Sequence, residues 1–338
     1  MKRVSFLVLI ASIGLALLAA CSKSPANPAA PPEQAGTQTK QLPQVEIVTF
    51  APPSLGYFLP PVIKAKEFDK KNGIEIKFVQ RPTTAYNTEF ATGQFKVGGS
   101  AALLSEGLRR DKGVKVSYLF NLFDFWGSVV TADPNIKSLK DLTDKKLAAS
   151  KSTTNYAMFQ FFAAKSGADI SKMEVQNAEP SGLMALLTAN RVDAVQVWEP
   201  AYSEVMAKNK GKYHDVDYGL GRWKQITGGN TIPYLGVAAH EDWIQQNKDL
   251  IPKMFQAYKD AATWTLQNPD EAAKFIAEPM KGDPKVIAEL IRNKDRLGLN
   301  VQPASSLKED IMAVMRAGLE IKYLQKLPDE SLVYGGLK

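Results

Sequence analysis

Residues 191–200 read Arg-Val-Asp-Ala-Val-Gln-Val-Trp-Glu-Pro, a short strand followed at once by a loop. Ala194-Val195-Gln196-Val197 contains two β-branched valines and only one polar residue, which predicts a buried strand. Glu179-Pro180-Ser181 predicts the start of a helix over about 182–190, because proline is favoured in the first helical turn. The stretch therefore predicts a helix, a buried strand and a Trp-Glu-Pro loop at the carboxyl end of that strand.

The same alternation of strands and helices extends outward in both directions. Further strands are expected at 45–48, 74–79, 97–100, 114–120, 128–131 and 146–149, and around Val175. Further helices are expected at 59–69, 86–91, 101–109, 156–166, 242–268, 269–278, 284–294 and 306–323. Strands separated by helix-length connections predict an α/β protein whose sheets are rich in parallel pairs.

The first residues carry the pattern of a secretion signal. Lys2 and Arg3 give a positive start, and residues 6–20 form an apolar run of 15 residues. That run is shorter than the roughly 20 residues that cross a bilayer. Leu18-Ala19-Ala20-Cys21 resembles a bacterial lipobox, whose cysteine carries lipid. We expect 1–20 to be a signal peptide and Cys21 the lipidation site; an ordinary secretory leader is the alternative.

Residues 21–43 are predicted to form a flexible tether. They are rich in Pro, Ala, Gln, Thr and Ser and have too few bulky apolar residues to offset the entropy of ordering. Removal of Lys2 and Arg3 with the leader lowers the formal charge from +7 to +7 − 2 = +5. We therefore expect a body held in the periplasm or at the cell surface by a membrane anchor.

Composition and motifs exclude several classes of protein. The 338 residues include one cysteine and two histidines, so a disulfide scaffold, a zinc enzyme and a redox dithiol protein are poor fits. The sequence has no Gly-x-Ser-x-Gly, His-Glu-x-x-His, phosphate-loop or dinucleotide glycine motif. Its basic residues are spread without a basic-aromatic cluster, which argues against nucleic acid as a partner. We expect no enzyme, no cofactor and no metal.

Several segments, taken in order, resemble the periplasmic solute-binding proteins of ABC transporters, of the sulfonate, nitrate, taurine and thiamine-pyrimidine-precursor type. The resemblance covers about residues 44–327. It is carried by a strand with a Pro-Ser loop followed by Lys70-Lys71-Asn72-Gly73-Ile74-Glu75-Ile76, and by the segments at 137–142, 145–148, 191–200 and 236–243. The order of these pieces is more specific than any one of them.

The resemblance implies a type II periplasmic binding protein of two lobes. Each lobe would be a mixed, mainly parallel sheet flanked by helices, and two crossing strands would form the hinge. Lobe 1 would comprise 44–132 and 234–338, and lobe 2 would comprise 133–233. The sequence departs from the family at Gln94-Phe95-Lys96, where an acidic residue is usual, so the local strand register there is left open.

Hydroxyl side chains follow several predicted strands, where ligands bind in open α/β sheets. Helix starts at these positions favour an anion, because their N–H groups are unpaired and the helix dipole is positive there. Capping of the helices themselves is the alternative role of these hydroxyls. The candidate ligand-binding residues of this kind are Ser54, Thr83, Thr84, Ser100, Ser152, Thr153 and Thr154.

Aromatic, acidic and amide side chains in the predicted loops complete the candidate site. Flat rings suit the walls of a cleft around a partly apolar ligand, although core packing would also explain them. Glu199 and Asp124 could accept from an ammonium or a ring N–H, and an internal ion pair would explain either of them. The remaining candidates are Tyr57, Tyr86, Trp126, Trp198 and Asn230.

The sequence leaves three functions open. The first is a lipid-anchored, monomeric receptor that captures a small organic anion or a heterocyclic or aromatic nutrient (a sulfonate, carboxylate or pyrimidine-like molecule) and delivers it to an ABC permease. The second, implied by a cytosolic relative of the family, is a pyridoxal-phosphate-dependent pyrimidine synthase. The third is a receptor that signals to a membrane partner.

Overall fold

Two mixed β-sheets organise residues 41–337, the part of the chain that the computed structural model describes. The predicted signal peptide, Cys21 and nearly all of the predicted tether lie outside the described residues. Within 41–337, no helix has the length and apolar character needed to cross a membrane.

The first sheet has six strands in the order β11-β4-β10-β3-β1-β2. β1 pairs in parallel with β2 and β3, whereas β10 is antiparallel to β3 and β4, and β11 is antiparallel to β4. The strands are β1 (Gln44–Phe50), β2 (Glu75–Arg81), β3 (Val97–Ala102), β4 (Val116–Asp124), β10 (Pro233–His240) and β11 (Leu299–Pro303).

The second sheet has five strands in the order β7-β6-β8-β5-β9. β6 pairs in parallel with β7 and β8, and β5 is antiparallel to β8 and β9. The strands are β5 (Ser128–Thr131), β6 (Lys146–Ala149), β7 (Glu174–Asn177), β8 (Ala194–Val197) and β9 (His214–Val216). Both sheets are mixed, as expected, but parallel pairing does not dominate either of them.

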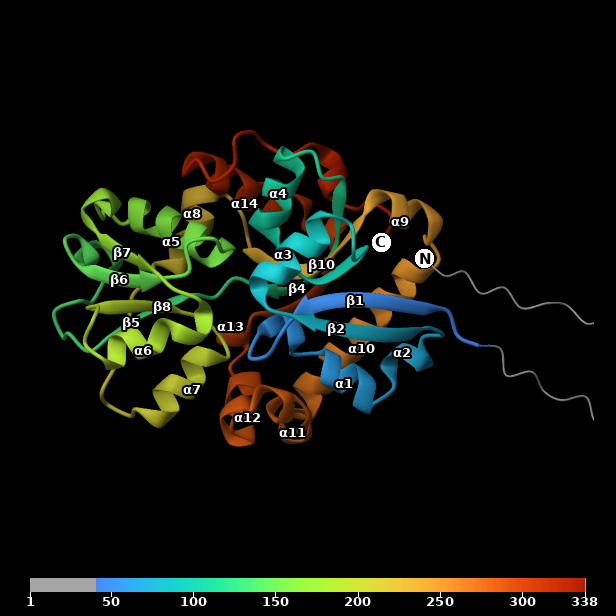
Figure 1. Cartoon of the computed structure of the whole chain (residues 1–338), viewed down its shortest axis with the longest axis horizontal. Coiled ribbons are helices and arrows are strands. Elements are labelled where there is room, and N and C mark those ends of the chain that lie inside the picture. The colour runs from blue at the N-terminus through green and yellow to red at the C-terminus, as the bar shows by residue number, and fades with distance from the viewer. Residues whose placement is uncertain (1–40, 338) are drawn as a thin grey trace, which may run out of the picture. The chain divides into compact units, whose positions relative to one another are not determined.

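Helices cover both faces of each sheet. In Figure 1, α3, α4 and α14 lie on one side of the first sheet and α1, α2 and α10 on the other, while α5 and α8 lie opposite α6 and α7 across the second sheet. The helices are α1 (Pro60–Ala65), α2 (Phe68–Lys71), α3 (Thr83–Ala91), α4 (Leu103–Asp111), α5 (Thr154–Lys165), α6 (Leu183–Thr188), α7 (Ala201–Lys208), α8 (Trp223–Thr227), α9 (Glu241–Gln246), α10 (Leu250–Gln267), α11 (Pro269–Met280), α12 (Pro284–Arg292), α13 (Lys294–Leu297) and α14 (Lys308–Glu320).

The chain crosses between the sheets twice. The first crossing lies between Asp124 and Ser128, because β5 already pairs with β8 and β9. The expected boundary at 132 therefore falls one strand too late. The return precedes β10, which begins at Pro233. The backbone N–H of Phe125 donates to the carbonyl of Ile232 at 2.7 Å, so a hydrogen bond joins the two crossings.

Alternating strand residues place a hydrophobic core on each face of the second sheet. Leu147 belongs to the larger hydrophobic core, which also contains the buried apolar residues of the first sheet. Ala148 belongs to a smaller core together with Leu183 and Val195. Successive side chains of a strand point to opposite faces of the sheet, so a sheet covered by helices on both faces buries neighbouring residues in two different cores.

Two long predicted helices are interrupted in the structure. The expected helix 59–69 divides into α1 and α2 at Glu67, whose φ of 53° places it in the left-handed region. The expected helix 242–268 divides into α9 and α10 between Gln246 and Leu250. Apolar residues recur with helical spacing across both breaks, so the spacing predicts one continuous helix in each case. It carries no signal for the positive φ of Glu67 or for the three residues between α9 and α10.

Candidate functional site

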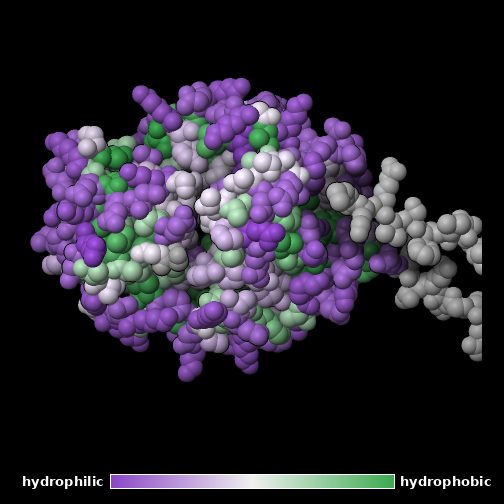
Figure 2. Space-filling view, in the orientation of Figure 1, coloured by the Kyte–Doolittle hydropathy of each residue, from purple (hydrophilic) through white to green (hydrophobic). Residues whose placement is uncertain are grey.

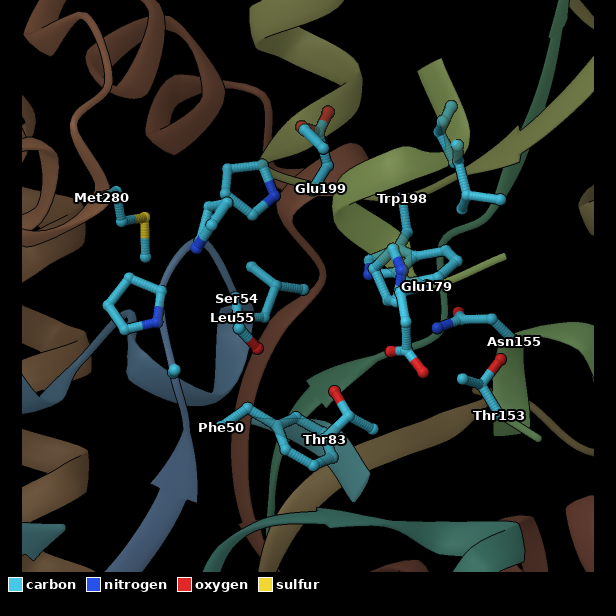
Figure 3. A pocket seen from close by; sticks show the side chains of 18 of the residues that line it. Phe50, Ser54, Leu55, Thr83, Thr153, Asn155, Glu179, Trp198, Glu199 and Met280 are labelled. Atoms are coloured by element: carbon cyan, nitrogen blue, oxygen red, sulfur yellow. The ribbon is translucent and has the colours of Figure 1, made fainter. Parts of the chain in front are cut away.

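A cavity of about 620 Å³ lies between the carboxyl ends of strands from the two sheets. Its lining comes from the segments that follow β1, β2 and β3 on one side and β6, β7 and β8 on the other, with the α11–α12 connection at its edge. Figure 2 shows a face that is hydrophilic around its rim and paler toward its middle. Figure 3 shows labelled cavity side chains that approach from both sheets. Strand ends thus converge on one site, as the α/β topology predicts.

Five of the seven predicted hydroxyl residues line this cavity: Ser54, Thr83, Ser152, Thr153 and Thr154. Thr84 does not line it and is exposed on α3. Ser100 does not line it either, because β3 continues to Ala102 and leaves Ser100 fully buried inside the strand. Its hydroxyl accepts from the backbone N–H of Phe50 at 2.8 Å, so its role is structural.

The Thr153 hydroxyl caps α5. It donates to the carbonyl of Ser150 at 2.8 Å and accepts from the backbone N–H of Tyr156 at 3.2 Å. Within the described residues, the N–H groups of Thr154 and Asn155 have no acceptor. Unpaired N–H groups at a helix start attract an anion. At α5, therefore, the backbone is available to a bound anion and the Thr153 hydroxyl is not.

Trp198 is the predicted aromatic residue that lines the cavity. Tyr57, Tyr86 and Trp126, which were also expected in the cleft, do not line this cavity. Tyr86 is buried with its ring centroid 4.5 Å from that of Phe50, and Trp126 packs edge-on against Tyr202 at 4.8 Å. Tyr57 is half-buried at the end of a short 3₁₀ turn, Leu55–Tyr57.

Glu199 borders the cavity, but its carboxylate is engaged within the chain. It is 1% exposed, lies 3.0 Å from Arg296 Nε, and accepts from the Ser203 hydroxyl at 2.9 Å and the Ser203 N–H at 3.1 Å. Burial raises the pKa of Glu199, while the Arg296 charge and the Ser203 bonds act in the opposite direction. Arg296 belongs to α13, so this ion pair joins the segment after β8 to an element beside β11 of the first sheet.

Asn230 and Asp124 lie away from the cavity lining. Asn230 is exposed, and its backbone N–H donates to Asp310 Oδ1 at 2.7 Å. Asp124 accepts from Asn300 Nδ2 at 2.9 Å and from Asn121 Nδ2 at 3.1 Å at the first crossing. Burial raises the pKa of Asp124 to about 6. Asp124 is therefore a residue of the first crossing, where both of its carboxylate oxygens accept hydrogen bonds from asparagine side chains.

Sequence reasoning missed two cavity asparagines. Asn87, on α3, accepts through Oδ1 from Arg109 at 2.6 Å, and Arg109 is paired with the buried carboxylate of Glu106. This arrangement leaves the Asn87 amide nitrogen available as a donor. Asn155 follows the hydroxyl run at 152–154 and donates through Nδ2 to the Tyr234 hydroxyl at 2.8 Å. Asn155 could have been predicted because it directly follows the candidate hydroxyl residues at 152–154. No feature of the sequence indicates that Asn87 lies at the cavity.

The cavity also has apolar and charged walls. Phe50, Leu55, Leu183, Met184 and Met280 supply apolar surface, and Lys208, Lys281, Glu179 and Glu204 supply charge. Met280 and Lys281 come from the end of α11, far in sequence from the strand ends. Among residues 41–337, no group of three or more His, Cys, Asp or Glu side chains is arranged to hold a metal ion. The arrangement suits reversible binding of a small molecule with an apolar body and polar ends.

Comparison with known proteins gives a family match and distant relatives. The family model described as NMT1/THI5 like matches residues 61–272. A Brucella abortus (strain 2308) protein named as a binding protein is 21% identical over 210 residues, which cover 62% of this chain and 61% of that protein. A Bacillus subtilis (strain 168) protein named as an aliphatic sulfonates-binding protein is 21% identical over 208 residues, covering 61% and 58%. The matched part of the chain thus spans about three fifths of the length of these curated relatives.

The solved structures include a close match in backbone geometry. The periplasmic aliphatic sulphonate binding protein SsuA from Escherichia coli superposes with a TM-score of 0.69 at 16% identity. The match covers 87% of this chain and 93% of that one. At this level of identity the likeness concerns the fold.

Proposed function

The chain belongs to the NMT1/THI5-like family and has the periplasmic binding protein fold, and we propose that it is the solute-binding receptor of an ABC importer. The cavity between the two sheets carries this proposal, because it gathers strand ends and helix starts from both sheets around one volume. Relatives named for sulfonate binding support an organic anion as the ligand.

The dimensions and chemistry of the cavity favour an organic molecule over a small inorganic anion. A volume of about 620 Å³ lies within the range of roughly 300–1,000 Å³ that holds drug-sized ligands. The N–H groups at the starts of α3 and α5 can receive an anionic group, while Trp198, Met184 and Met280 can cover an apolar or ring body. We propose a sulfonate, carboxylate or pyrimidine-like ligand.

Contacts across the cavity support a mechanism of closure on the ligand. The hydroxyls of Ser105 on α4 and Thr154 on α5 lie 3.2 Å apart. Glu204 on α7 accepts from the backbone N–H of Asp283, beside α12, at 2.8 Å. A ligand that contacts both sides stabilises the conformation in which these contacts form over a more open one. The size of this shift is set by the difference between the ligand's affinities for the two conformations.

A thermal-shift screen tests the proposed ligand class. A ligand that binds the folded state raises the melting temperature by mass action. We expect at least one compound among aliphatic sulfonates, aromatic carboxylates and pyrimidines to raise it, and nitrate to have no effect. Ala201→Trp, which adds bulk at a cavity-lining position, should abolish the shift. Equal shifts in the variant, or no shift with any organic compound, would contradict the proposal.

We also propose attachment to the membrane through lipid on Cys21, with cleavage after residue 20. The apolar run, the lipobox-like segment and the position of the single cysteine support this proposal. Cys21→Ala should move the protein from the membrane fraction to the soluble periplasmic fraction and prevent incorporation of labelled palmitate. Unchanged membrane association and labelling would show that another residue or segment holds the protein.

We propose a binding role without catalysis. The named relatives are binding proteins, and neither histidine of this chain lines the cavity. His214 Nε2 contacts the carbonyl of Ile136 at 3.0 Å, and His240 Nε2 contacts the carbonyl of Phe90 at 2.7 Å. The resemblance to the cytosolic pyridoxal-phosphate-dependent relative implies a reaction that uses a histidine of the chain itself. The position of both histidines away from the cavity therefore favours binding over that reaction.

A further inference from the structure

A buried ion pair lies directly behind one wall of the cavity. Glu106 and Arg109 stand one turn apart on α4, where the Glu106 side chain is fully buried and the Arg109 side chain is 8% exposed. Neither residue lines the cavity. Taking two charges out of water costs free energy, and the pair need not add net stability. We therefore looked for a role of the pair in the site itself.

The Arg109 guanidinium is held in place from several sides. It pairs with the Glu106 carboxylate, and its Cζ lies 5.2 Å from the ring centroid of Phe90 and 5.9 Å from that of Tyr86, both on α3. Its Nη2 donates to Asn87 Oδ1 at 2.6 Å. Asn87 does line the cavity, so the buried pair reaches the cavity wall through this one hydrogen bond.

This contact decides which end of the Asn87 amide a bound molecule meets. A guanidinium has five N–H donors and no acceptor, so only the oxygen of the amide can face Arg109. Asn87 is half-buried, and its Nδ2 keeps accessible surface and has no acceptor within residues 41–337. The cavity is therefore offered an N–H donor at this position, whereas an unrestrained asparagine can present either end of its amide.

We propose that Arg109, held by Glu106, is a positioning residue that fixes the Asn87 amide so that Nδ2 donates to an oxygen atom of the bound molecule. Arg109 itself does not touch that molecule. A donor that is fixed before binding loses less conformational freedom when the molecule arrives, and this raises affinity. Because Glu106 balances the Arg109 charge, the pair orients a neutral amide without adding net charge behind the wall. This inference rests on the proposed receptor function.

A double-mutant cycle measured by calorimetry tests this role with three probes that carry oxygen acceptors: ethanesulfonate, benzoate and uracil. Asn87→Leu removes the donor at similar volume and should weaken binding of at least one probe about tenfold. Replacing the pair by Glu106→Leu with Arg109→Met leaves no buried charge without its partner, and it should weaken binding of the same probe about threefold. In the Asn87→Leu background, the pair replacement should have no further effect, because Arg109 acts only through Asn87.

Arg110→Met provides the matched control. Arg110 is the next residue on α4 and bonds to Glu241 and Asp329, and none of these three residues lines the cavity. This variant should lower the melting temperature and leave the affinity for the same probe unchanged. A loss of affinity that follows the melting temperature in all variants would show a merely structural role for Arg109.

Arg109→Lys gives a second version of the cycle. It keeps the positive charge beside Glu106 but lacks the forked donors of arginine, and its effect should likewise disappear in the Asn87→Leu background. An equal effect of the pair replacement in both backgrounds, or unchanged affinity in Asn87→Leu, would overturn the positioning role and leave the receptor function standing. Absence of binding of all three probes to the natural sequence would contradict both.

Discussion

Replacing Arg296 with methionine tests the buried ion pair that joins the two halves of the cavity region. Glu199 is 1% exposed, and the Arg296 side chain is 29% exposed. Methionine preserves much of the side-chain volume beside the Trp126 and Tyr202 rings, against which the guanidinium packs at 6.0 and 5.2 Å. The variant therefore removes mainly the positive charge.

The expected cost follows from the surroundings of Glu199. Breaking a buried pair typically costs about 3–5 kcal/mol, because one charge stays buried without its partner. Both Ser203 bonds to the carboxylate remain, and Arg296 is partly solvated. The loss of unfolding free energy should therefore be about 2–4 kcal/mol at pH 7.5.

The loss should depend on pH in a defined direction. Burial raises the pKa of Glu199, and removing Arg296 should raise this pKa further. When folding raises the pKa of an acidic group, the protein loses unfolding free energy as the pH rises above the unfolded-state pKa of that group. The reason is that the folded state binds the proton more tightly than the unfolded state does. The destabilisation should thus be largest at pH 7.5 and should shrink to about 1 kcal/mol or less near pH 4, where the unfolded carboxyl is largely protonated.

Urea denaturation of the natural sequence and the variant at pH 4, 5.5 and 7.5 measures this dependence. Lys294→Met, which removes an exposed positive charge from the same short helix, provides the control and should change stability by less than about 0.5 kcal/mol. A cost for Arg296→Met that is equal at all three pH values would refute the reasoning. So would a cost no larger than that of the control.

Three other predictions concern the cavity and the first crossing. Trp198→Ala should weaken binding of a ligand from the thermal-shift screen by about 1–3 kcal/mol in calorimetry, and unchanged affinity with a lowered melting temperature would show a packing role instead. Thr153→Ala should cost about 1 kcal/mol in urea denaturation because it removes a helix cap, whereas Ser152→Ala should leave stability unchanged; equal costs would contradict the capping role. Asp124→Asn should remove a fall in stability of about 2 kcal/mol as the pH rises from 4 to 6, because burial raises the pKa of Asp124 to about 6; the same pH slope in both proteins would assign the fall to other groups.

The short buried strands could be predicted from the sequence with their bounds. Residues 128–131, 146–149 and 194–197 form strands over the expected ranges. Residues 128–131 and 194–197 each contain two β-branched valines and follow Gly127 and Asp193, so local composition marks where these two strands begin. Residues 146–149 are Lys-Leu-Ala-Ala, which have no strand preference of their own, and their place in the strand–helix alternation is what predicted this strand. The short strands β9 and β11 were missed, because neither has a clear alternating pattern and both form by pairing with strands distant in the chain.

The candidate site could be predicted at the level of loops but only partly at the level of side chains. Tyr86 was expected in the cleft, yet it stands four residues before Phe90, and this helical spacing turns both rings toward the core. Ser100 was taken for a strand end, but the strand runs two residues further. Met280 lies at the cavity through tertiary packing across the chain, and sequence spacing carries no signal for such a contact.

Calorimetry with the organic anion that gives the largest thermal shift tests the account most directly. The cavity between the two sheets predicts one molecule bound per chain with micromolar or tighter affinity, and no measurable binding to Ala201→Trp at the same concentrations. Binding of equal affinity in both proteins would place the ligand elsewhere and contradict the account.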